Sequence, residues 1–183
     1  MADKTQLFTE AMALYSEAGL KFTMDELATR LCISKKTLYE MVRSKEDLII
    51  QVIQFYFEKV AALQDAIHAD ESLSSLQKLR KLLCATPDFA IRRHHLHEMK
   101  MNYPLAFKEL DDKLRIGWER TFEVMEQAKK ENAICKIDNY LFSKVYAAAI
   151  EEIIMGNDAQ PYYNFSQRQE EIVDILIFGI VNK

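Results

Sequence analysis

The chain has 183 residues, of which 49% are hydrophobic and 28% are charged, and its formal net charge is −4. This size and composition are typical of one or two folded domains and exclude a disordered chain. With 4 glycines and 3 prolines, the chain is too poor in turn residues for a dinucleotide-binding fold, a P-loop or an all-β fold. We therefore expect an all-α protein.

Cysteine spacing and hydropathy predict the compartment. Cys32, Cys84 and Cys135 lie far apart without a Cys-x-x-Cys pair, a pattern that favours free thiols in a reducing environment. No apolar run reaches the ~18 residues that a membrane-spanning helix needs, and residues 1–9 lack the pattern of a signal peptide. We expect a cytoplasmic protein with no membrane partner and predict no cofactor.

Three short helices are predicted before residue 44. Apolar residues recur every three or four positions up to Gly19, a residue type that commonly ends a helix. Thr23 and Glu26 form a capping box that opens a second helix, and Ser34 caps a third. Two short helices joined by a tight turn are typical of a helix-turn-helix, whose second helix enters the major groove of DNA.

A long fourth helix begins after Ser44, and its apolar face continues to Ile67. Beyond it the spacing predicts a fifth helix ended by Pro87, then helices over 89–101, 104–132 and 137–155, and a last one opened by the capping box Ser166-x-x-Gln169. The expected architecture is therefore about nine helices with no strand.

Positive charge is concentrated around the predicted third helix. Residues 30–45 hold five basic residues and one acidic residue, a net charge of +4 in a chain whose total is −4. If Leu38 and Val42 face inward, the residues left outward to meet base edges and phosphates are Lys35, Lys36, Thr37, Tyr39 and Glu40. Lys45, at the next helix start, is expected to clamp a backbone phosphate.

Three stretches make this segment specific: FTMDELA over 22–28, ISKKTLY over 33–39 and SKEDL over 44–48. They resemble the DNA-binding motif of the tetracycline-repressor (TetR) family of transcriptional regulators. The rest of the chain resembles that family only in the number, order and length of its helices. The resemblance implies a three-helix DNA-binding domain over 1–46 and a helical domain over 47–183 that binds an effector and dimerises through the last two helices.

Residue roles follow from the same resemblance. It assigns a phosphate contact to Thr23, groove and phosphate contacts to Lys35, Lys36, Thr37 and Tyr39, and the role of the family's lysine at the fourth helix to Lys45. Lys36 departs from the family pattern because it stands where a small residue is common. Val42 stands where a large aromatic residue is common, and Arg43 where a proline or a polar residue is common. Glu40 stands where an aromatic residue or histidine is frequent. A carboxylate there repels phosphate but can accept a hydrogen bond from cytosine N4.

We predict a homodimeric transcriptional repressor that binds operator DNA. A small-molecule effector is expected to release the protein from the DNA by shifting the long fourth helix. Wide apolar faces over 140–154 and 172–181 favour a dimer interface. Aromatic residues, methionines and histidines of the predicted fifth to eighth helices are candidates for the effector pocket. These candidates are His94, His97, Met101, Phe107, Trp118, Phe122 and Tyr146.

Two other functions compete with this prediction. His94, His97 and Glu98 share one helix face and could serve an all-helical metal-dependent enzyme. No metalloprotease or di-iron motif accompanies them, so we predict no metal site and no catalytic residue. A helical binding protein that no longer reads DNA is the other alternative, supported by Glu40 and the net charge of −4.

Overall fold

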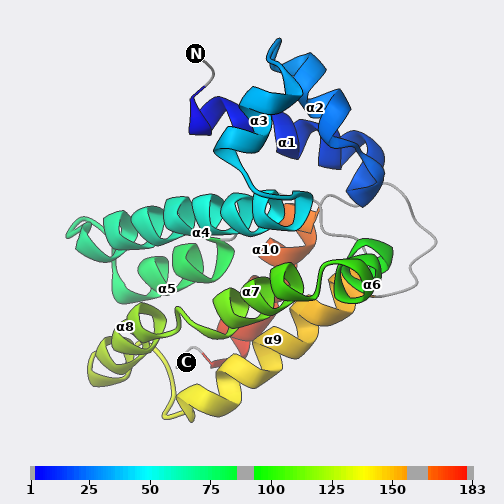
Figure 1. Cartoon of the computed structure of the whole chain (residues 1–183). Coiled ribbons are helices and arrows are strands. Elements are labelled where there is room, and N and C mark those ends of the chain that lie inside the picture. The colour runs from blue at the N-terminus through cyan, green and yellow to red at the C-terminus, as the bar shows by residue number, and fades with distance from the viewer. Residues whose placement is uncertain (1–2, 86–92, 156–164, 181–183) are drawn as a thin grey trace. The chain divides into compact units, whose positions relative to one another are not determined.

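The computed structural model describes residues 3–85, 93–155 and 165–180, and in these ranges it contains ten α-helices, one 3₁₀ helix and no strand (Figure 1). The predicted all-α fold is confirmed. The elements are α1 (Lys4–Ala18), η1 (Gly19–Lys21), α2 (Met24–Arg30), α3 (Lys35–Met41), α4 (Lys45–Ala69), α5 (Ser75–Cys84), α6 (Arg93–Asn102), α7 (Pro104–Arg115), α8 (Glu119–Lys130), α9 (Asn139–Met155) and α10 (Phe165–Ile180). Within the same ranges no helix has both the length and the apolarity to cross a membrane.

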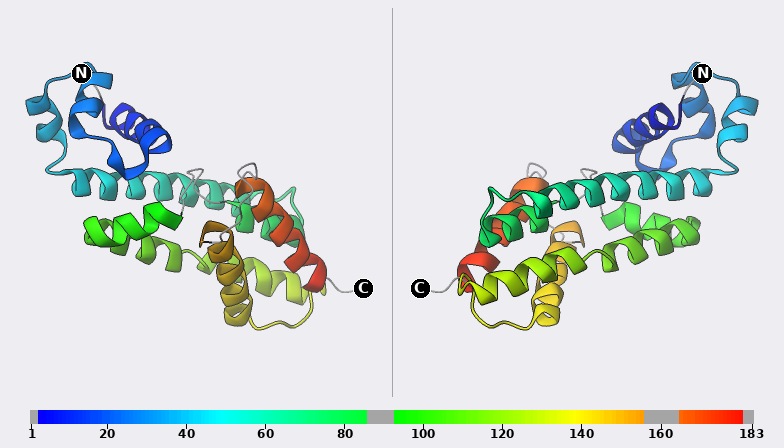
Figure 2. Two further views of the ribbon diagram at one scale, coloured as in Figure 1. Left: turned by 90° about the vertical axis from the view of Figure 1, so that its right-hand side faces the viewer. Right: turned by 90° about the vertical axis from the view of Figure 1, so that its left-hand side faces the viewer.

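The chain packs as two compact units. The first unit comprises Met1–Glu58 and Phe89–Leu114, and the second comprises Lys59–Asp88 and Arg115–Lys183. Helix α4 is continuous (Figure 2) and contributes residues to both. These units are defined by how the chain packs. The predicted domains 1–46 and 47–183 are defined by function, DNA binding and effector binding, and that division stays a prediction.

The core of the first unit joins the short N-terminal helices to α4 and α7. In this unit α1 packs on η1 and α2, and α2 packs on α3. One leucine from each of five helices is at most 2% exposed: Leu7, Leu27, Leu38, Leu48 and Leu110. Because full burial of a leucine contributes about 2 kcal/mol, this shared core fixes α3 on its supporting helices.

The second unit has a core of its own. Helix α5 packs against α8 and α10, and α10 also packs against α9. Leu79, Met125 and Val173 are fully buried at the centre of this cluster, and Phe142 is 2% exposed. The last two helices therefore turn one face to this core and keep the other for solvent or a partner.

The segment predicted as one helix over 104–132 is two helices in the structure. Helix α7 ends at Arg115 and α8 begins at Glu119. Gly117 between them has a φ of 110°, a backbone conformation that glycine adopts without steric cost. The apolar spacing continues across this break, so periodicity alone predicts nine helices where the described residues form ten.

The predicted capping box at Ser166 and Gln169 is wrong. Helix α10 already includes Phe165, and Gln169 is 2% exposed. Its side-chain Nε2 donates to the carbonyl of Leu83 at 2.9 Å and to the hydroxyl of Tyr146 at 3.0 Å. A glutamine suits a helix start and a buried hydrogen bond equally well, so spacing alone did not separate the two roles.

We expect Gly19→Ala to destabilise the protein by about 2–3 kcal/mol. Gly19 has a φ of 62°, and a Cβ added there would lie 2.4 Å from Nε2 of His95. Urea denaturation measures the loss. Gly117→Ala is the matched control, because its φ is also positive but nothing lies within 4 Å of an added Cβ. If the two variants lose the same free energy of unfolding, the His95 ring moves aside for the added Cβ at no cost.

Candidate nucleic-acid interface

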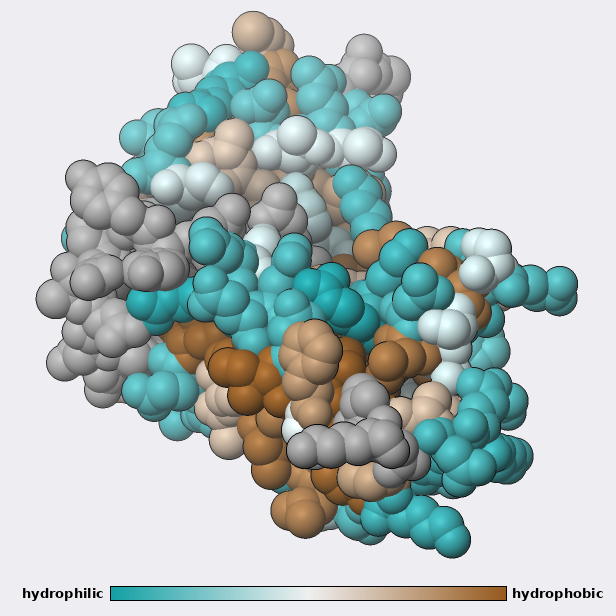
Figure 3. Space-filling model, turned by 180° about the vertical axis from the view of Figure 1, so that it is seen from behind, coloured by the Kyte–Doolittle hydropathy of each residue, from teal (hydrophilic) through white to brown (hydrophobic). Residues whose placement is uncertain are grey.

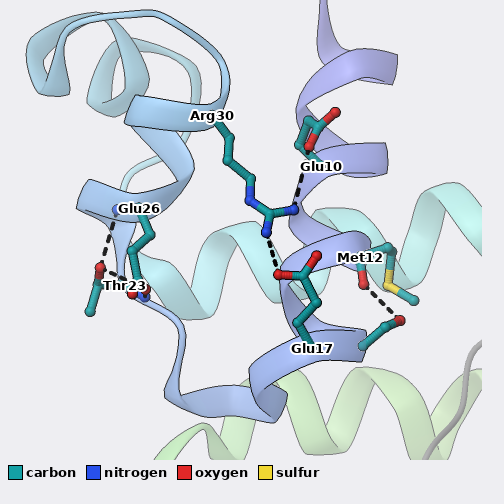
Figure 4. Close-up of polar contacts among 7 residues, drawn as sticks. Glu10, Met12, Glu17, Thr23, Glu26 and Arg30 are labelled. Carbon is teal, nitrogen blue, oxygen red and sulfur yellow. Dashed lines mark hydrogen bonds and ion pairs between the residues drawn. The ribbon is translucent and has the colours of Figure 1, made fainter.

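The helix-turn-helix begins with the capping box predicted at Thr23. The hydroxyl of Thr23 accepts from the amide of Glu26 at 3.2 Å, and the Glu26 carboxylate accepts from the amide of Thr23 at 2.7 Å (Figure 4). This backbone hydrogen bond lowers the pKa of Glu26. The Thr23 hydroxyl also donates to that carboxylate at 3.0 Å. Thr23 is exposed, and its phosphate contact stays a prediction.

The turn between α2 and α3 is tight. Cys32 adopts a φ of 53°, and its amide donates to the carbonyl of Thr29 at 3.1 Å, which closes the end of α2. Ser34 then caps α3 by accepting from the amide of Thr37 at 3.0 Å. Leu38 is fully buried as predicted, so the opposite side of α3 faces solvent.

All the residues predicted to face outward on α3 are exposed, namely Lys35, Lys36, Thr37, Tyr39 and Glu40. Tyr39 is 49% exposed, a large exposure for an aromatic residue on a short helix. Lys35 pairs with Asp25 of α2 at 2.5 Å, whereas Lys36 has no ion pair or side-chain hydrogen bond within the described residues. The ammonium of Lys36 is thus available to an external anion.

Arg30 contributes to the fold and not to this exposed surface. Its guanidinium lies between two carboxylates of α1, donating to Glu17 and lying 3.9 Å from Glu10 (Figure 4). These contacts raise the pKa of Arg30, chiefly through the hydrogen bond to Glu17. The predicted net charge of +4 over 30–45 therefore overstates the positive charge that α3 and its flanks present outward.

Lys45 lies at the start of the fourth helix as predicted, but its ammonium is engaged within the protein. It is the first residue of α4, and its ammonium donates to the backbone carbonyls of Leu20 and Phe22. The same nitrogen lies 4.3 Å from the centroid of the Phe22 ring, within the range of a cation–π contact. Burial lowers the pKa of Lys45. Two of its three donors are engaged inside the protein, which is not the arrangement expected of a phosphate clamp.

The predicted effector-pocket residues fall in both units. In the first unit His97 is exposed, Met101 is 67% exposed, and the ring of Phe107 lies 5.6 Å from Nζ of Lys100. The side chain of His94 lies outside the described residues.

In the second unit the structure brings three of the predicted pocket residues together. The ring centroid of Trp118 lies 5.7 Å from that of Phe122 and 5.4 Å from that of Tyr146. The hydroxyl of Tyr146 donates to the carbonyl of Leu83 at 2.6 Å, and burial raises its pKa to about 12. The cluster belongs to the core of this unit, and its role in binding an effector stays a prediction.

An apolar cavity of about 40 Å³ within the first unit was not predicted. It is lined by residues of α1, η1, α4, α6 and α7, among them Met12, Tyr15, Val52 and Met99. None of the predicted pocket residues lines it. The apolar residues at these positions have the helical spacing of core residues. That spacing is the same whether the core is fully packed or contains a cavity, so the sequence does not predict the cavity.

His95 is the histidine of its cluster that the sequence prediction missed. It is 8% exposed, and its Nδ1 lies 3.0 Å from the hydroxyl of Tyr15. The buried neighbours Leu96 and Met99 put position 95 on the inner face of α6, which was the available signal. Among the described side chains, which do not include that of His94, no three His, Cys, Asp or Glu residues are grouped to hold a metal ion.

Comparisons with known proteins agree with this geometry. No protein-family model matches the chain. It is 26% identical over 178 residues to an uncharacterized HTH-type transcriptional regulator, YvaF of Bacillus subtilis, covering 96% of this chain and 94% of the relative.

Solved structures of similar fold include a TetR transcriptional regulator from Legionella pneumophila, with a TM-score of 0.72, 20% identity and coverage of 96% of this chain and 97% of that one. AibR, solved with isovaleryl coenzyme A and operator DNA, has a TM-score of 0.65 and 16% identity and covers 94% and 97% of the two chains. At these identities the likeness establishes the fold. The chain therefore has the fold of the TetR family of transcriptional regulators.

Proposed function

We propose that the protein is a cytoplasmic, non-enzymatic transcriptional repressor of the TetR family that binds double-stranded operator DNA. The observation that carries the proposal is the outer side of α3, where Lys36 and Tyr39 are exposed while Leu38 between them is fully buried. A short helix held rigidly on its core and presenting a cation and a phenol suits the major groove. Residues 1–46 form the DNA-binding domain in this proposal, and residues 47–183 bind the effector and dimerise.

The proposal includes a homodimer formed through α9 and α10. Large hydrophobic side chains are exposed on both helices, namely Tyr140, Leu141, Val145, Ile175 and Phe178. Figure 3 shows hydrophobic side chains gathered on one face of the molecule, in the lower half of the view. A second copy of the chain is the natural cover, because two half-sites of operator DNA require a two-fold symmetric protein.

A small-molecule effector completes the proposal. AibR, which has a similar fold, was solved with both isovaleryl coenzyme A and operator DNA. In this chain the aromatic cluster of Trp118, Phe122 and Tyr146 belongs to the second unit, and α4 contributes to that unit as well as to the first. An effector bound near the cluster would act on the DNA-binding helices by shifting α4.

Selection from a random library of DNA duplexes tests the proposal and requires no operator sequence as a starting point. We expect the full-length protein to enrich a palindromic duplex and to bind it at least ~10³-fold more tightly than unselected duplexes, as specific regulators do. Fluorescence anisotropy at several salt concentrations measures both affinities. Failure to enrich any sequence, or binding equal to that of unselected duplexes, would remove the proposed function.

A further inference from the structure

Two adjacent residues open α4 and extend their side chains to different parts of the first unit. Lys45 donates to the carbonyls of Leu20 and Phe22, which lie in η1 and in the link to α2. The carboxylate of Glu46 accepts from the amide of Leu105 at 2.8 Å and from that of Ala106 at 3.5 Å.

The Glu46 contact acts as a cap supplied by another helix. Helix α7 begins at Pro104, so the amides of Leu105 and Ala106 belong to its first turn and have no partner within that helix. A carboxylate at this end satisfies these donors and interacts favourably with the helix dipole. Helix α7 therefore takes its position partly from α4.

The Lys45 contact is its counterpart on the DNA-binding side. The link to α2 passes through Phe22, whose ring also lies beneath the ammonium at 4.3 Å. Tyr103, one residue before α7, places its ring 5.5 Å from the same nitrogen. The ammonium thus lies between the entry to α2 and the turn between α6 and α7.

We infer that Lys45 and Glu46 are a positioning pair that holds the entry to α2 and the α6–α7 turn on the first turn of α4. Lys45 supports the DNA-binding helices from inside the protein and does not neutralise a phosphate. The part of the inference that concerns DNA rests on the proposed function, and the part that concerns the pair itself does not. Lys36, exposed on α3 without a partner among the described residues, is the matched lysine that does face outward.

Salt dependence of DNA binding separates the two roles of a lysine. A lysine that neutralises a phosphate contributes about 0.9 to the slope of log K against log salt concentration. With a duplex selected by the wild-type protein, we expect Lys36→Met to reduce the slope by about that amount per protomer. Lys45→Met is expected to weaken binding at every salt concentration and to leave the slope unchanged. A slope reduced to the same extent in both variants would overturn the inference.

Hydrogen exchange on the DNA-free protein provides an independent measurement. We expect Glu46→Ala to accelerate exchange of the Leu105 and Ala106 amides at least ~5-fold, because their acceptor is lost. Glu46→Gln, whose amide oxygen still accepts, should restore most of the protection. Lys45→Met should accelerate exchange across residues 20–26, whereas Lys36→Met should not. Unchanged exchange in both Glu46→Ala and Lys45→Met would refute the positioning pair, even if the protein binds no DNA at all.

Discussion

Phe178→Glu should convert the proposed dimer into a monomer and lower affinity for the selected duplex at least ~100-fold. Phe178 is 78% exposed on α10 in the single chain, and Ile175, one turn earlier on the same helix, is 71% exposed. In a two-fold interface each substitution occurs twice, and an aromatic anchor at its centre contributes about 2 kcal/mol or more. Sedimentation equilibrium measures the oligomeric state, and fluorescence anisotropy measures the DNA affinity.

Leu63→Glu on α4 is the matched control, since Leu63 is also a large exposed hydrophobic residue, at 50% exposure, but lies outside the proposed interface. It should remain dimeric and bind the duplex as the wild type does. If Phe178→Glu also remains a dimer, another surface holds the two copies together. A monomeric Phe178→Glu with full affinity would show that the half-sites do not need a preformed dimer.

Local patterns predicted the helix-turn-helix segment closely because its structure is set by contacts between sequence neighbours. Thr23 and Glu26 are three residues apart, and so are Ser34 and Thr37, and both caps form as expected. Leu38 is buried and Tyr39 exposed, as helical periodicity requires once one face is assigned to the core.

Contacts between residues distant in sequence were not predictable in the same way. A basic residue beside a recognition helix is equally consistent with a phosphate contact and with an internal one. Only the tertiary structure brings the carbonyls of Leu20 and Phe22 to the first turn of α4, where they accept from the ammonium of Lys45. The same holds for Arg30, whose partner Glu17 is thirteen residues away on α1. The number of charged residues over 30–45 was read correctly from the sequence. Whether each charged side chain faces solvent or a partner within the protein depended on tertiary structure.

The position of the proposed effector pocket is the part that sequence patterns define least. Core and pocket residues share the same apolar types, so composition cannot distinguish the aromatic cluster around Trp118 from a binding site. The side chains of Tyr146 and Gln169 are buried beside that cluster, and both donate to the carbonyl of Leu83. Their hydroxyl and amide groups make the cluster partly polar, which no sequence spacing indicates. Such groups orient ligands in apolar pockets, but here they are already satisfied by one another.

Replacing Lys36 and Tyr39 together by alanine should lower affinity for the selected duplex at least ~100-fold, since each groove or phosphate contact contributes about 1–3 kcal/mol. The single variants should differ in kind. Lys36→Ala should reduce the salt slope by about 0.9 per protomer, because an ammonium exposed on α3 releases counterions when it meets a phosphate. Tyr39→Ala should weaken binding with the slope unchanged, because a phenol carries no charge at neutral pH.

Stability and dimerisation should be unaffected by either substitution, because both side chains are exposed on α3 and neither contributes to the buried core. Lys81→Ala, an exposed lysine of α5, is the control for the loss of one positive charge and should leave both affinity and slope unchanged. Wild-type affinity in the double variant would show that α3 is not the helix that enters the groove. If Lys36 contacts a phosphate directly, its loss should reduce the salt slope and the loss of Lys81 should not. A reduced slope in Lys81→Ala would instead mean that the salt dependence reports the net charge of the whole protein.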